Sequence, residues 1–180
     1  MTALNNACVP PHNGKVAARS GPIDVYCPRV PNLVDPFREM LEGSPTTAAL
    51  LAGTTLNLCL EFALRGRFPP DEKVFDEVFS ESGTLGTLTD KLAIAYAMRL
   101  FGPTLYSDLL MVQAIRDKFA DGAARTFEDT RVASTIGAIR IVETWRDAGE
   151  DFASLQTEFA FAVRALWIVL LQEPAGIFNA

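Results

Sequence analysis

Histidine and cysteine are scarce in this 180-residue sequence. The single histidine, His12, lies near the N-terminus, so the rest of the chain has no histidine base for a catalytic triad or for acid–base chemistry. The cysteines are Cys8, Cys27 and Cys59. Cys8, His12 and Cys27 match no paired-ligand spacing and lack a fourth ligand, so we predict no metal site and no cofactor. Cys59 lies in a helical pattern, where a small buried core residue is expected.

Positively charged residues are also fewer than negatively charged ones. Lysine and arginine number 16 against 22 aspartates and glutamates, a net charge of −6. An acidic chain without a basic run is not expected to bind DNA directly through its phosphates. The N-terminus lacks the charged start and apolar centre of a signal peptide, and the apolar run 159–171 is too short to span a membrane. We therefore expect a cytoplasmic protein without a membrane segment.

Periodic apolar patterning is missing from the first 35 residues. Residues 1–32 hold five of the eleven prolines, which indicates an extended proline-rich arm over 1–35. The arm carries three positive and two negative charges, so the remaining chain has a net charge of −6 − 1 = −7. Residues 36–180 are long enough to bury a sizeable core and are predicted to form one helical domain.

Strand patterns are absent, whereas capped segments with a period near 3.6 residues recur throughout 36–180. They predict an all-α antiparallel bundle of about five to seven helices. The expected helices span 36–42, 44–65, 71–79, 88–102, 103–120, 130–148 and 151–172. The last is apolar nearly all round. It is either fully buried or exposes an apolar face to a second subunit.

Arg116 is the first candidate functional residue. It falls within the apolar stripe of the helix predicted over 103–120, where a guanidinium requires a carboxylate, carbonyls or an anion. One interpretation is a structural ion pair, with Asn57 and Glu61 as partners in a polar core and Asp121 as a further possibility. The other is an arginine that lines a cleft or a dimer seam. On the first interpretation Arg116→Ala lowers the melting temperature, whereas Arg146→Ala, near a helix end, does little.

Gly83 and Gly86 precede no Gly-Lys-Ser/Thr, so they are not a phosphate-binding loop. Thr87, with Asp90 three residues later, is typical of a helix cap in which Asp replaces Glu. A plain turn and cap is expected here; an anion at the helix start is the alternative.

The run from Leu85 to Tyr96 has the form Leu-Gly-x-Leu-x-x-Lys-(apolar)-x-(apolar)-Ala-Tyr. A helix follows that ends in Arg-x-x-Phe-Ala from Arg116, and Phe127 then precedes two acidic residues. Over about residues 45–140 the chain resembles the mannitol operon repressor family. The resemblance implies an all-helical protein of transcription regulation. Since no helix-turn-helix with a basic recognition helix is present, it implies contact with a protein rather than direct reading of DNA.

The Arg-x4-His signature of the HEPN ribonuclease superfamily is similar to the same segment. Arg116 occupies the arginine position and Asp117 the polar position after it, but Asp121 stands where the histidine would be. A carboxylate repels phosphate and is expected to pair with Arg116 or Arg125. The similarity therefore implies no RNA cleavage. Because HEPN-like bundles pair, it also favours a homodimer.

Three functions follow from the sequence. The first is a non-catalytic regulatory or protein-interaction domain, with Arg116, Asp117, Asp121 and Arg125 as contact residues. The second is an RNA- or nucleotide-binding module with a degenerate HEPN motif. The third is an antitoxin-like or scaffold helical domain.

Overall fold

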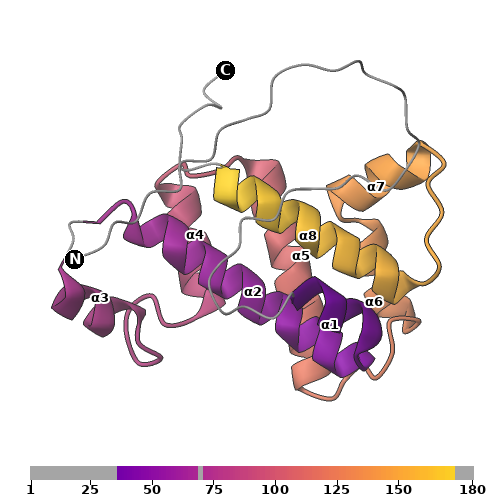
Figure 1. The fold of residues 1–180 in the computed structure, drawn as a ribbon, viewed down its shortest axis with the longest axis horizontal. Coiled ribbons are helices and arrows are strands. Elements are labelled where there is room, and N and C mark those ends of the chain that lie inside the picture. Colours follow the sequence, from indigo (N-terminus) through magenta and orange to yellow (C-terminus); the bar gives the residue numbers. More distant parts are fainter. Residues whose placement is uncertain (1–35, 69–70, 173–180) are drawn as a thin grey trace, which may run out of the picture.

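The computed structural model describes residues 36–68 and 71–172, and over these residues it contains eight helices and no strand (Figure 1). The all-α prediction is confirmed. The proline-rich arm and the residues Cys8, His12 and Cys27 lie outside the described residues. The helices are α1 (Pro36–Glu42), α2 (Pro45–Arg65), α3 (Glu72–Phe79), α4 (Leu88–Ala97), α5 (Pro103–Ala120), α6 (Thr130–Gly137), α7 (Arg140–Asp147) and α8 (Leu155–Gln172).

Helix α2 is the centre of the bundle and contacts α1, α4, α5 and α8. Ser44 caps it by accepting a hydrogen bond from the Thr47 N–H at 3.1 Å, and Pro45 occupies its first turn. By length and composition α2 is apolar enough to cross a membrane, with half of the relevant window buried in the fold. Its contacts with four neighbouring helices make it a core helix here. Cys59 is buried within it, as predicted.

Helix α8 lies along α2 and is fixed to the α1–α2 turn (Figure 1). The Gln156 amide donates to the backbone carbonyls of Met40 at 2.8 Å and Gly43 at 2.9 Å. The ring centroids of Phe37 and Trp167 lie 5.2 Å apart. Most large side chains of α8 are buried, but Phe161 and Val169 remain exposed. The helix is therefore chiefly a core helix that is not fully buried, and its expected contact with a second subunit stays a prediction.

The helix predicted over 130–148 is wrong in one respect, because the structure divides it into α6 and α7. The chain turns at Ala138 and Ile139, and the Ile139 side chain is fully buried. The Arg140 N–H at the start of α7 donates to the Asp108 carboxylate of α5 at 3.0 Å. Burial raises the pKa of Asp108, although the hydrogen bond from Arg140 and the charge of Arg140 act against this shift. A contact from α5 therefore sets the second helix start.

Helix α4 also ends earlier than predicted, at Ala97. Arg99 adopts a left-handed conformation with φ of 55°, and the Leu100 N–H returns to the Ala95 carbonyl at 3.0 Å. This turn directs Leu100 and Phe101 into the core, where both are buried.

Arg146 joins α7 to α8. Its guanidinium binds both Glu158 carboxylate oxygens at 2.7 Å, and Glu158 is buried. The side-chain hydrogen bonds that Arg146 donates to Glu158 raise the pKa of Arg146 above its ordinary value. A Cβ added to Gly137 would meet Nη1 of Arg146 at 2.6 Å. The sequence-based expectation that Arg146 is dispensable is not supported by this two-point contact.

Candidate functional site: the Arg116 cleft

The start of α4 is built by the run Leu85–Lys91. Thr87 caps the helix by accepting the Asp90 N–H at 3.2 Å, and its hydroxyl donates to the Asp90 carboxylate. Leu85 is buried, and a Cβ on Gly86 would overlap the Ser80 and Glu81 carbonyl oxygens. The predicted turn and cap is confirmed. It brings the loop after α3 close to the start of α4.

Lys91, not Arg116, is the cation of the polar core. Its ammonium group donates to Asn57 at 3.0 Å and to Glu61 at 2.9 Å, and only 1% of the side chain is exposed. Glu61 also pairs with Arg65 at 2.9 Å. Asn57 and Glu61 are thus partners of Lys91, and the pairing of these two residues with Arg116 that the sequence analysis expected is wrong.

Arg116 lies at the edge of the buried face of α5, and 46% of its side chain is exposed. Its aliphatic stem rests on α2 at Gly53, where a Cβ would meet the Arg116 Cγ at 2.8 Å. The guanidinium pairs with Asp117 at 2.8 Å. A long side chain can thus cover apolar surface while its charge stays in water. The expectation that Arg116 is a buried structural pivot is therefore corrected.

Arg116 lines a cleft of about 520 Å³ between α2, the start of α4 and α5. Hydroxyl, amide and charged groups from these segments converge on it. The lining residues are Gly53, Thr54, Asn57, Glu81, Gly86, Thr87, Leu88, Thr89, Gln113, Arg116 and Asp117. Two of the predicted contact residues, Arg116 and Asp117, thus belong to one cleft.

A seam between α4 and α5 leads into this cleft. The Gln113 amide donates to the Thr89 hydroxyl, and the Tyr96 and Tyr106 rings stack at 4.5 Å with 12° between their planes. These two contacts pair the helices in antiparallel order. On α5, Leu110 lies one helical turn from both Tyr106 and Gln113, so the tyrosine stack and the cleft share one face. Leu110 and Tyr96 are both exposed on it.

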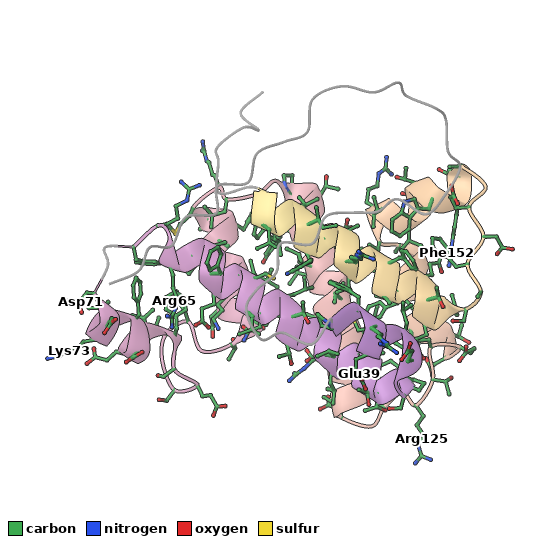
Figure 2. The ribbon with its side chains drawn as sticks, viewed as in Figure 1. Glu39, Arg65, Asp71, Lys73, Arg125 and Phe152 are labelled. Atoms are coloured by element: carbon green, nitrogen blue, oxygen red, sulfur yellow. The ribbon has the colours of Figure 1, made fainter. Side chains whose placement is uncertain are left out.

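The other predicted contact residues do not line the cleft. Asp121 follows the last turn of α5, where its N–H bonds the Asp117 carbonyl, and its side chain is exposed. Arg125 projects away from the fold at one end of the bundle (Figure 2). The structure therefore separates Arg125 from the Arg116 cleft.

Sequence reasoning missed Lys91, Gln113 and the tyrosine pair. In the sequence, Lys91 stands out only as one position of the motif from Leu85 to Tyr96. Its burial depends on contacts with α2. Tyr96 and Tyr106 are ten residues apart, and only the hairpin of α4 and α5 brings them together. Their stacking could have been predicted had this hairpin been placed in register.

Some of the polar and charged groups around the cleft have a partner among the described residues, and others do not. Arg116 is paired with Asp117, and Asp90 faces the capping hydroxyl of Thr87. Glu81 has no ion-pair partner among residues 36–68 and 71–172, and the buried Oε1 of Gln113 has no hydrogen-bond partner there. Within the same residues, no group of three or more histidine, cysteine, aspartate or glutamate side chains could hold a metal ion.

Comparison with solved structures gives a fold match. The chain is similar to a chain of the X-ray structure of the MtlR–HPr complex from Escherichia coli, with a TM-score of 0.63 and 13% sequence identity. The match covers 76% of this chain and 96% of that chain. Neither the scan against protein-family models nor the search of curated proteins found a match. At this identity, the similarity establishes a shared fold.

Proposed function

We propose that this protein is a non-catalytic regulatory domain that acts by binding another protein through the Arg116 cleft and the adjoining α4–α5 seam. The observation that supports this proposal most directly is the composition and placement of this surface. Tyrosine and arginine are enriched in protein interfaces, and here a stacked tyrosine pair lies beside a cleft lined by a half-exposed arginine.

The structural neighbour supports the same class of function. Its structure is a complex of two proteins, MtlR and HPr, and it shares this fold. We propose by extension that the chain regulates transcription through protein contacts rather than by reading DNA, that it acts in the cytoplasm, and that it forms a homodimer. HPr is the first candidate partner to titrate against it.

Site-specific photo-cross-linking tests the proposed surface without assuming a partner. A photoreactive phenylalanine analogue replaces Leu110, which is 36% exposed on the seam, or as a control Val74 on α3, which is 45% exposed. The full chain is irradiated in its native cells, and cross-linked proteins are identified by mass spectrometry. We expect a second protein to be captured from position 110 alone, and capture to weaken in the Arg116→Ala background.

Arg38→Ala is the matched control, because Arg38 is likewise exposed and paired, with Glu42 on α1 at 3.1 Å. It should leave capture unchanged. Equal capture from positions 110 and 74 would place the interaction elsewhere. Equal capture from position 110 in the Arg116→Ala and Arg38→Ala backgrounds would show that the Arg116 side chain takes no part in the contact.

A further inference from the structure

We infer that the Arg116 cleft takes a lysine or arginine side chain of the partner protein; the inference rests on the proposed function and names the chemistry of the group that enters. An arginine beside a helix N-terminus at first suggests an anion site. The contacts within the cleft favour the opposite charge.

Both positive features of the cleft already face a carboxylate. Arg116 is held by Asp117 at 2.8 Å. The start of α4, where the helix dipole favours negative charge, has the Asp90 carboxylate in its first turn, bonded to the capping hydroxyl of Thr87. A phosphate or carboxylate entering the cleft would compete with these two carboxylates for the same positive groups.

Within the part of the chain that the structure describes, the accessible charged group of the cleft that is left without a partner is an acceptor, Glu81. Glu81 lines the cleft and is exposed, and it pairs with no cation in the described chain. The nearby cation Lys91 is only 1% exposed and is bound by Asn57 and Glu61, so it does not neutralise Glu81. An ammonium or guanidinium group has the charge and the N–H donors that this surface accepts.

The charge of the whole chain acts in the same direction. At a net −6, the protein attracts basic surfaces over distances up to the Debye length and repels acidic ones. Such complementarity chiefly affects the association rate and the choice of partner.

Nuclear magnetic resonance titration of the full chain tests the inference. The probes are the N-acetyl amides of lysine, arginine and glutamate, together with inorganic phosphate. We expect the lysine and arginine probes to shift the backbone amide resonances of Gly86, Thr89 and Gln113. Glu81→Gln should weaken this binding roughly two- to fivefold, as for one solvent-accessible charge pair. Glu128→Gln, which changes an exposed glutamate outside the cleft, should leave it unchanged.

Stronger shifts of the same amides by phosphate or by the glutamate probe would overturn the inference, as would equal lysine affinity in parent and Glu81→Gln proteins. A partner that cross-links from position 110 but binds Glu81→Gln normally would refute the basic side chain and leave the proposed function standing. Lysine binding with no partner captured from position 110 would instead overturn the assignment of the cation to a partner protein.

Discussion

At the scale of single residues, Arg146 and Arg116 exchange the roles that the sequence indicated. Arg146 makes two hydrogen bonds to Glu158, whose side chain is 6% exposed, whereas Arg116 pairs with a neighbour on the surface. A helical stripe marks the face of a residue, but an arginine at its edge can turn its charge outward. Conversely, an arginine near a helix end can be structural although 44% of its side chain is exposed, because the next helix supplies a buried carboxylate as its partner.

Arg146→Ala is therefore expected to destabilise the protein. It removes both donors from a buried carboxylate, which costs about 2–3 kcal/mol because water still reaches the arginine side of the pair. The melting temperature should fall by roughly 4–10 °C. Arg140→Ala is the control: its pair with Glu143 is exposed on both sides and contributes under about 1 kcal/mol. Equal melting of the two variants in calorimetry would contradict a structural role for Arg146.

Asp108 predicts a pH dependence of stability. Burial raises its folded pKa above the ordinary value of 3.8, so the folded state keeps this proton over a range in which the unfolded chain has lost it. The contribution of Asp108 to stability is thus largest below the unfolded pKa and falls as the pH rises to the folded pKa. An asparagine in its place can still accept the Arg140 N–H through its amide oxygen.

Relative to the parent, Asp108→Asn should therefore gain stability as the pH rises through this range and hold that gain at neutral pH. Urea unfolding at a series of pH values measures the difference. Asp147→Asn, at an exposed position, controls for the loss of one charge. A difference between parent and Asp108→Asn that does not change with pH would show that the buried carboxyl is not the cause.

At the scale of helices, local signals predicted most helix boundaries. They failed where a boundary is set by a contact with an element that is distant in the sequence. Ser44-Pro45 and Gly102-Pro103 marked the starts of α2 and α5, because a cap followed by proline is a local feature. The break between α6 and α7 depends on Asp108, which lies 32 residues before Arg140. For the same reason the polar core could be predicted only in part: Asn57 and Glu61 share a face of one helix, but their cation comes from another.

At the scale of the whole molecule, the described helices leave apolar side chains uncovered on α2 and α8. Phe62 on α2 is 68% exposed, Leu58 is 49% exposed, and Val169 on α8 is 39% exposed. Neighbouring exposed apolar groups on a soluble domain commonly mark an association surface. Each closed two-fold dimer buries the same patch from both copies. These side chains are the basis on which we expect a homodimer.

Light scattering on the purified full chain should accordingly give the mass of two chains. Phe62→Glu places a charge on the proposed contact and should shift the mass toward one chain, while circular dichroism remains that of the folded helical protein. Val74→Glu is the matched control, since Val74 is also exposed but lies on α3. A parent protein with the mass of one chain would exclude the homodimer. A dimer equally resistant to both substitutions would move the contact away from α2.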